Sequence, residues 1–317
     1  MKKTLIALAV LAVSGAAFAQ SSVTLYGVAD IAVGELKQAD KFGALANSGM
    51  NNGTSRIGFR GTEDLGGGLK ASFNFEQGVS LADGGTDRTA AGVNLPIYQR
   101  AAFMSISGDF GEVAAGRRLT PAFFAKAAYE LTGTANYSAL GKQFGYSSAG
   151  VGAGARRDGL VTYTTPNFGG VTATVGTVFE GNNASKPMEF NVIYRGGPMV
   201  VAFQMDSASN TAPGAKRGSS IGGSYNFGVA KVAASYQDPA GPKKGFTLGA
   251  SAPVGPVTLT ADIARATNDA GKNTDLLLEV KYALSKRTFA YGAYQKDGQV
   301  GGVKAINGYA LGLRHNF

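Results

Sequence analysis

The segment Leu69-Lys70-Ala71-Ser72-Phe73-Asn74-Phe75-Glu76 alternates apolar and polar side chains at every step. Successive residues of a β-strand point to opposite faces of a sheet, so this segment predicts a strand with one apolar and one polar face. The same period of two returns near both ends of the chain, over residues 23–33 and 309–317. Helix-forming stretches are scarce, and only residues 121–131 predict a helical turn or two. We therefore expect an all-β fold.

Two kinds of break alternate between these segments. Seven breaks are short, and all but the last carry glycine or proline, which permit tight hairpin turns. They lie at 64–68, 108–111, 166–170, 196–198, 226–228, 253–256 and 284–287. Eight breaks are longer and polar, near 36–53, 81–95, 118–157, 181–187, 208–217, 238–244, 267–273 and 297–304. These connections predict sixteen strands, and an even number places both chain ends on the side of the short turns.

The first 19 residues have the features of a cleaved secretory signal of a bacterium. Lys2 and Lys3 precede an unbroken apolar run at 5–13, and Ala17-Phe18-Ala19 forms an A-x-A cleavage site. That run is shorter than the ~20 residues a membrane-spanning helix needs, and no other stretch reaches 18 apolar residues. The sequence thus predicts a signal peptide at 1–19 and one mature domain at 20–317.

The alternation of short and long connections separates two all-β architectures. A soluble sandwich does not need it, because its apolar faces are buried against each other. A transmembrane barrel has short periplasmic turns, long external loops, an apolar outer face and a polar interior. The barrel must also close, since lipid cannot satisfy the polar groups of an open sheet edge. We therefore expect a 16-stranded antiparallel transmembrane β-barrel.

The composition argues against several functional classes. The 317 residues contain no cysteine and a single histidine, so a thiol nucleophile, a thiolate metal site and chemistry with two imidazoles are excluded. That histidine, His315, lies near the C-terminus with outward parity, which disfavours a serine–histidine hydrolase. The formal net charge is +9, but the basic residues are dispersed among strands, which disfavours a nucleic-acid surface. We expect no catalytic residues, no metal and no cofactor.

Three further stretches are distinctive: Val23-Thr24-Leu25-Tyr26-Gly27, residues 55–68 from Ser55-Arg56-Ile57-Gly58-Phe59 to Gly66-Gly67-Gly68, and residues 309–317, which end in Phe317. All three resemble the Gram-negative general porin family. Ala115-Gly116-Arg117-Arg118 and Pro166-Asn167-Phe168-Gly169-Gly170 are similar to the β-proteobacterial branch of that family. Together, in this order, they span essentially the whole mature chain.

The resemblance implies a homotrimer of barrels in the outer membrane, in contact with its lipid, each barrel holding a water-filled pore. It implies that the third external loop folds inward and narrows the pore, and the third long break, 118–157, is the longest in this chain. It also implies that the barrel-assembly machinery recognises the terminal Phe317.

Three arginines are candidates for the pore wall. Strand alternation turns Arg56, Arg100 and Arg156 toward the lumen. Their positions match the basic ladder that the resembled family places opposite its third loop. Rings of charge at the narrowest point set ion selectivity in such pores. We therefore expect these three arginines at the pore constriction.

Three further charged residues are less clearly placed by the sequence. Arg117 shares the parity of lipid-facing residues unless its strand has ended at Gly116, and it is included with the constriction. Glu130 is the one acid between Arg118 and Arg157, and it either faces the pore or lies at a contact between loop and wall. Arg314 is inward by parity but is expected near the periplasmic mouth.

The sequence therefore predicts an outer-membrane channel for passive diffusion of small hydrophilic solutes, with a preference for anions. Two alternatives stay open. The channel could serve one solute class, such as phosphate or a dicarboxylate, or the outer loops could act mainly as an adhesin or receptor.

Overall fold

The computed structural model describes residues 22–36, 41–44, 50–86, 95–148, 154–179, 188–206, 216–241, 243–268, 273–298 and 306–317. The predicted signal peptide at 1–19 lies outside these ranges, as do parts of several predicted long connections.

The described residues form strands and two short helices. The strands are β1 (Ser22–Leu36), β2 (Lys41–Ala44), β3 (Arg56–Gly66), β4 (Leu69–Gly78), β5 (Ala101–Gly108), β6 (Gly111–Leu119), β7 (Arg156–Thr164), β8 (Val171–Val178), β9 (Met188–Gly196), β10 (Met199–Asp206), β11 (Ser219–Asn226), β12 (Lys231–Asp238), β13 (Gly245–Val254), β14 (Val257–Ala266), β15 (Thr274–Ala283), β16 (Thr288–Asp297) and β17 (Ile306–Asn316). The helices are α2 (Pro121–Tyr129) and α3 (Ala139–Phe144), and neither is long and apolar enough to cross a membrane.

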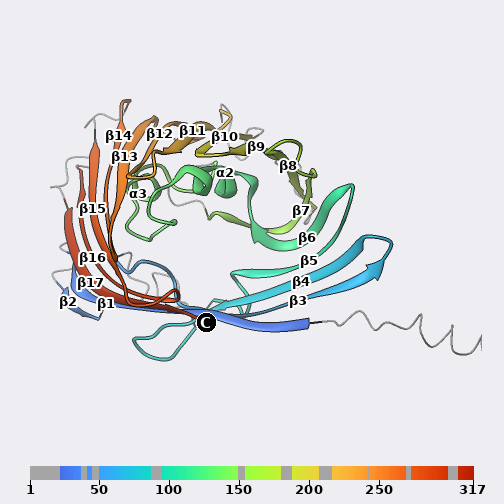
Figure 1. Cartoon of the computed structure of the whole chain (residues 1–317), viewed down its shortest axis with the longest axis horizontal. Helices are drawn as coiled ribbons and strands as arrows, with labels where there is room; N and C mark the ends of the chain where they lie inside the picture. Colours follow the sequence, from blue (N-terminus) through green and yellow to red (C-terminus); the bar gives the residue numbers. More distant parts are fainter. Residues whose placement is uncertain are drawn as a thin grey trace, which may run out of the picture.

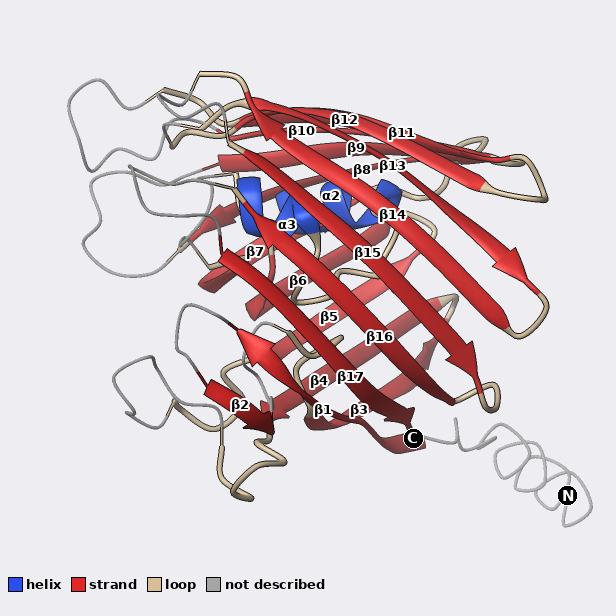
Figure 2. Cartoon of the chain, turned by 90° about the vertical axis from the view of Figure 1, so that its left-hand side faces the viewer, coloured by secondary structure: helices blue, strands red, loops and turns tan. Residues whose placement is uncertain are grey.

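The strands close into a ring, which Figure 1 shows end-on. Residues 22–28 of β1 pair with β3, and residues 28–36 pair with β17, so β1 joins the two ends of the sheet. The short strand β2 pairs with the outer end of β1. The other strands make the predicted closed 16-stranded antiparallel barrel, which is confirmed. The carboxyl end of the chain lies with the short turns (Figure 2).

Alternation along the strands produces two different faces. Val23, Leu25, Phe59 and Leu311 are 66%, 53%, 41% and 72% exposed on the outer face. Their polar or small neighbours turn inward, where many are buried by the third loop. The buried clusters of this protein accordingly lie inside the barrel, between that loop and the wall.

The third loop folds into the barrel, as the sequence predicts. Helix α2 packs against β9, β10 and β11, and α3 packs against β14 and β15 (Figure 1). Thr120 caps α2, its Oγ1 accepting a hydrogen bond from the backbone N–H of Phe123, and Pro121 occupies the first turn, where its missing N–H costs nothing. The helical segment predicted near 121–131 is confirmed. Helix α3 has only six residues and gives no periodic signal that could predict it.

Candidate functional site

A cavity of about 510 Å³ lies inside the barrel between the third loop and one side of the wall. Charged side chains of the wall line it together with small and polar residues of the loop. The wall contributes Gly53, Thr54, Arg56, Glu76, Arg100, Leu119, Ala155, Arg156 and Arg314, and the loop contributes Phe123, Gly133, Thr134, Ala135, Asn136, Gly141, Lys142 and Tyr146. The structure thus brings Arg56, Arg100 and Arg156 together, on β3, before β5 and on β7.

A carboxylate from β4 lies among these arginines. Glu76 Oε1 is 2.7 Å from Arg100 Nε, and Glu76 Oε2 is 3.5 Å from Arg56 Nε. The hydroxyl of Tyr26 donates to Glu76 Oε2 over 3.0 Å. Arg156 Nε donates to the backbone carbonyl of Arg100 over 2.6 Å. Glu76 on β4 thus holds the guanidinium groups of Arg56 and Arg100, and the backbone just before β5 holds that of Arg156, so the cationic wall is preorganised.

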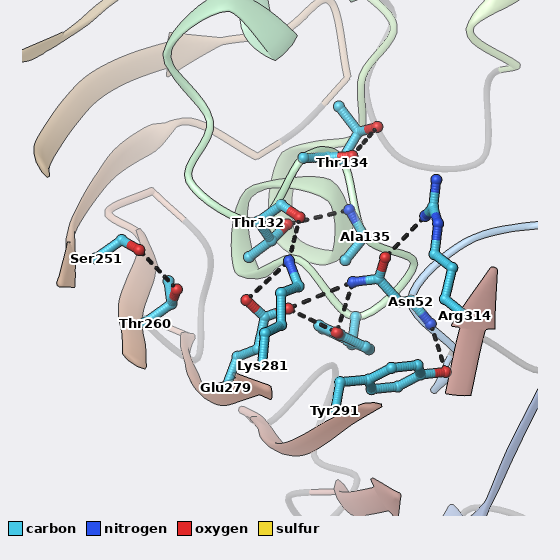
Figure 3. Close-up of polar contacts among 12 residues, drawn as sticks. Asn52, Thr132, Thr134, Ala135, Ser251, Thr260, Glu279, Lys281, Tyr291 and Arg314 are labelled. Carbon is cyan, nitrogen blue, oxygen red and sulfur yellow. Dashed lines mark hydrogen bonds and ion pairs between the residues drawn. The ribbon is translucent and has the colours of Figure 1, made fainter. Parts of the chain in front are cut away.

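Arg314 on β17 completes this wall. Its Nη1 donates to Asn52 Oδ1 over 2.8 Å (Figure 3). Its guanidinium lies 5.9 Å from the ring centre of Phe289. Asp30 and Arg314 are partners in the pairing of β1 with β17, and the backbone N–H of Gly53 donates to Asp30. Residues 50–55 therefore lie against the wall beside Arg314. Our expectation that Arg314 lies near the periplasmic mouth is wrong.

The lining of the cavity is strongly cationic. It contains Arg56, Arg100, Arg156, Arg314 and Lys142 against a single acid, so its formal charge is +4. Charges in a passage between low-dielectric walls interact more strongly than charges in free water. The cavity can therefore attract small anions and repel small cations without forming any bond.

Helix α2 carries a fully buried lysine. Lys126 is 0% exposed, and its Nζ donates to the carbonyl oxygens of Gly145 and Ser147 over 3.0 and 2.8 Å. Burial lowers the pKa of Lys126 to about 7, and the carboxylates of Glu189 and Asp206 partly oppose that shift. This contact joins the helix to the returning half of the loop.

The tip of the loop is held by a second set of contacts, which Figure 3 shows. The hydroxyl of Tyr137 donates to Glu279 Oε2 over 2.6 Å and accepts from Asn52 Nδ2 over 2.8 Å. Lys281 Nζ donates to the carbonyl of Thr132 over 2.8 Å and lies 3.1 Å from Glu279 Oε1. We call Asn52, Tyr137 and Glu279 the loop latch. The latch therefore joins the third loop to β15 of the wall.

Two residues predicted at the constriction are held by contacts outside the cavity lining. A β-bulge between Gly116 and Arg118 changes the register of β6 with β7, and Arg117 pairs there with Asp158 and donates to the carbonyl of Gln99. Arg117 is not part of the cavity lining. The carboxylate of Glu130 accepts hydrogen bonds from residues 132 and 134 of its own loop, and it too is outside the lining. The structure thus favours the loop contact over the pore for Glu130.

Sequence reasoning missed two members of the site. Glu76 ends the alternating segment 69–76, so parity predicts that its side chain points inward, but parity does not predict its depth in the barrel beside Arg100. Lys142 belongs to α3, which the sequence does not predict. Predicting the positions of these two residues requires the strand register and the path of the third loop.

The predicted assembly residue lies at the seam of the barrel. Phe317 and Gly27 exchange two backbone hydrogen bonds of 3.0 and 3.1 Å. A Cβ added at Gly27 would lie 2.4 Å from Cζ of the Phe317 ring, so glycine is needed for this close approach. The terminal residue therefore takes part in closing the barrel.

Comparison with known proteins gives full-length relatives. The family described as Gram-negative porin matches residues 4–302. The chain is 37% identical to outer membrane porin protein 32 of Delftia acidovorans over 99% of this chain and 95% of that protein. It is 29% identical to an outer membrane porin protein of Bordetella pertussis over 100% of both. The solved anion-selective porin from Comamonas acidovorans superposes with a TM-score of 0.74 at 34% identity, over 94% of this chain and 100% of that one.

Proposed function

This chain belongs to the Gram-negative porin family, and on that premise we propose that it is an anion-preferring channel for small hydrophilic solutes, with its selectivity set at the arginine-lined cavity. The predicted resemblance to β-proteobacterial porins is confirmed, and the protein is an outer-membrane barrel. Family and fold point to a channel rather than an enzyme.

The observation that carries the proposal is the formal charge of +4 on the cavity lining. Arg56, Arg100, Arg156 and Arg314 supply most of it from the wall, and Lys142 adds to it from the loop. A full-length solved relative at 34% identity is described as anion-selective, which supports the same sign of selectivity here.

Transport through this site requires no covalent step. Rings of charge and the pore diameter select among hydrated solutes at the narrowest point. The arginines lower the electrostatic energy of an anion in the passage, and the third loop limits the size of what passes. Guanidinium keeps its charge across neutrality, so the wall stays cationic there.

We also propose the partners that the family implies. Three copies form a homotrimer, and the barrel-assembly machinery recognises the terminal Phe317 during insertion. The hydrogen bonds between Phe317 and Gly27 support an assembly role, because they close the sheet at its last strand.

Replacement of Arg56 and Arg100 by glutamine tests the selectivity proposal. The double variant should lose chloride-over-potassium preference at low salt. It should differ little from wild type near 1 M, where the screening length falls to ~3 Å. Reversal potentials of reconstituted channels in KCl gradients measure both.

The matched control removes two arginines outside the cavity. Arg195 and Arg287 are exposed near the short turns and are not part of the lining. Their double glutamine variant changes the net charge equally and should keep the wild-type preference. Full chloride preference in the Arg56/Arg100 variant would refute the proposed role of the wall.

A further inference from the structure

The end of the first long connection turns into the barrel before β3 begins. We call residues 50–55 the inner turn. Its side chains are buried rather than exposed as in an external loop, with at most 3% exposure at Met50, Asn51, Asn52 and Ser55. Gly53 and Thr54 of the inner turn line the arginine cavity. The first connection therefore reaches the passage for solutes, as the third loop does.

The inner turn is anchored to β1 at a break in the strand ladder. On one side, β1 pairs with β3 as far as Val28 and with β2 from Val33 onward. Between these pairings, Ser55 Oγ accepts from the backbone N–H of Asp30 over 2.8 Å and donates to its carbonyl over 2.9 Å. The backbone N–H of Gly53 donates to Asp30 Oδ2 over 3.0 Å. These hydrogen bonds replace ladder contacts of β1 and fix the inner turn against the wall.

Asn52 connects the inner turn to the third loop, to β16 and to β17. Its backbone N–H donates to the hydroxyl of Tyr291 on β16 over 2.9 Å, and its carbonyl accepts from the backbone N–H of Asn136 over 3.2 Å. In its side chain, Nδ2 donates to the hydroxyl of Tyr137 over 2.8 Å, and Oδ1 accepts from Arg314 Nη1 over 2.8 Å (Figure 3). Four polar groups of one residue thus hold a cation of the wall and the tip of the third loop.

Arg314 is held by a different kind of partner from the arginines near β4. The guanidinium of Arg100 pairs with the carboxylate of Glu76 over 2.7 Å. Arg314 is instead held by two amide oxygens, Asn52 Oδ1 and, over 3.2 Å, Asn316 Oδ1, and it makes no ion pair with an acid in the described part of the chain. An amide oxygen accepts a hydrogen bond but carries no net charge. The contact with Asn52 therefore orients the guanidinium of Arg314 without neutralising it.

The inner turn also packs directly on this guanidinium. A Cβ added at Gly53 would lie 2.6 Å from Arg314 Nη1 and 3.5 Å from its Cζ, so the close approach requires glycine. Asp30 is the cross-strand partner of Arg314, but its Oδ1 accepts from the hydroxyl of Tyr291 over 2.7 Å and its Oδ2 from the N–H of Gly53. The inner turn thus lies between the acid of β1 and the cation of β17.

We propose that Asn52 is a positioning residue for ion selectivity, which holds the guanidinium of Arg314 at the cavity and so makes this arginine a selectivity-determining cation. The inference rests on the proposed function as an anion-preferring channel. An arginine side chain has many rotamers, and a planar guanidinium loses little entropy when its position is fixed in advance. The energy of a passing ion falls with its distance from the charge and with screening, so the position of Arg314 matters as well as its charge. The first connection then shares control of the constriction with the third loop.

Reversal potentials of reconstituted channels in KCl gradients test Asn52 and Arg314 as a pair. Arg314→Gln removes one charge about 6 Å from a passing ion, which should lower the chloride-to-potassium permeability ratio roughly threefold at ~0.1 M salt. Asn52→Ala releases the guanidinium, and a retreat of that charge by about 3 Å should lower the ratio roughly twofold. This twofold effect should disappear when Arg314→Gln is already present, because Asn52 acts through Arg314.

The matched control breaks the other side-chain contact of Asn52. Tyr137→Phe removes the hydroxyl that Asn52 Nδ2 binds and leaves Arg314 in place, so its effect on the ratio should be the same with and without Arg314→Gln. A second variant, Gly53→Ala, keeps Asn52 and places a methyl group against Arg314 Nη1. It should change the ratio in the parent channel and leave it unchanged beside Arg314→Gln. Heat-modifiable migration on gels verifies that each variant is folded.

Two results would overturn the role of Asn52. One is an equal effect of Asn52→Ala with and without Arg314→Gln, which would make Asn52 a structural residue only. The other is an unchanged ratio in both Asn52→Ala and Gly53→Ala. A wild-type channel without chloride preference would contradict the proposed function alone, because the coupling between Asn52 and Arg314 is measured as a difference between variants.

Discussion

Replacing Glu76 by glutamine should raise the anion preference of the channel. The carboxylate is the one acid in the cavity lining, and its loss changes the formal charge there from +4 to +5. Glutamine keeps one oxygen that can accept from Arg100 Nε, and its amide N–H can donate to the hydroxyl oxygen of Tyr26, whose own proton can go to Asn74 Oδ1. The arginine wall should therefore stay in place while its counter-charge is removed.

The size of the effect follows from Coulomb's law. A carboxylate about 6 Å from a passing ion contributes roughly 0.7 kcal/mol in water. Its removal lowers the energy of chloride in the passage and raises that of potassium by this amount each. Without screening, the energy difference between the two ions changes by about 1.4 kcal/mol, so their permeability ratio changes roughly tenfold. At 0.1 M salt the screening length of ~10 Å about halves the energy, which leaves roughly threefold.

Reversal potentials of single reconstituted channels in KCl gradients measure this change. The matched control is Glu112→Gln, because Glu112 pairs with Arg118 and lies outside the cavity lining. The control should keep the wild-type ratio. A Glu76→Gln channel whose chloride preference is unchanged or lower at low salt would refute the proposed electrostatic role of Glu76.

Three further perturbations test the loop and the seam. Tyr137→Phe removes the hydrogen bonds of the Tyr137 hydroxyl to Glu279 and Asn52 in the loop latch, and the bond to the carboxylate is worth about 1.5–3 kcal/mol. Single-channel recordings of this variant should show higher conductance and more current noise. An unchanged recording would contradict the role of the latch. Burial lowers the pKa of Lys126 to about 7 in the docked loop, whereas a free lysine titrates near ~10.4. Between these two pH values the released loop binds more protons than the docked loop, so docking of the loop should strengthen as the pH rises. Current noise should fall over that range in wild type and lose this dependence in Lys126→Met, and a rise in noise would reverse the sign we derive. Deletion of Phe317 should abolish the pair of hydrogen bonds to β1 and leave misassembled protein, and heat-modifiable barrel at normal outer-membrane levels would contradict its assembly role.

The barrel could be predicted because its signal is local. Alternation such as that of residues 69–76 indicates which side chains face lipid. The lengths of the connections indicate the number of strands and on which side of the membrane each turn lies. The helix after Pro121 was also visible, since Thr120 and Pro121 form a start signal that needs no tertiary information. Each of these features depends on neighbours in sequence.

The site was only partly predictable because depth in the barrel depends on register. Parity turns both Arg56 and Arg314 inward, but their common height is set by the pairing of β1 with both β3 and β17. The bulge at Gly116, with φ of 131°, changes the register before Arg117, and a strict period of two cannot anticipate it. Glu130 binds its own loop because a backbone turn follows α2 directly.

The reversal potential of the wild-type channel in a tenfold KCl gradient tests the central claim most directly. A cationic lining predicts a potential of the sign given by chloride permeation, largest at low salt and shrinking toward 1 M as screening shortens from ~30 Å at 0.01 M to ~3 Å. A potential of the potassium-selective sign at low salt would contradict the assignment of selectivity to Arg56, Arg100 and Arg156.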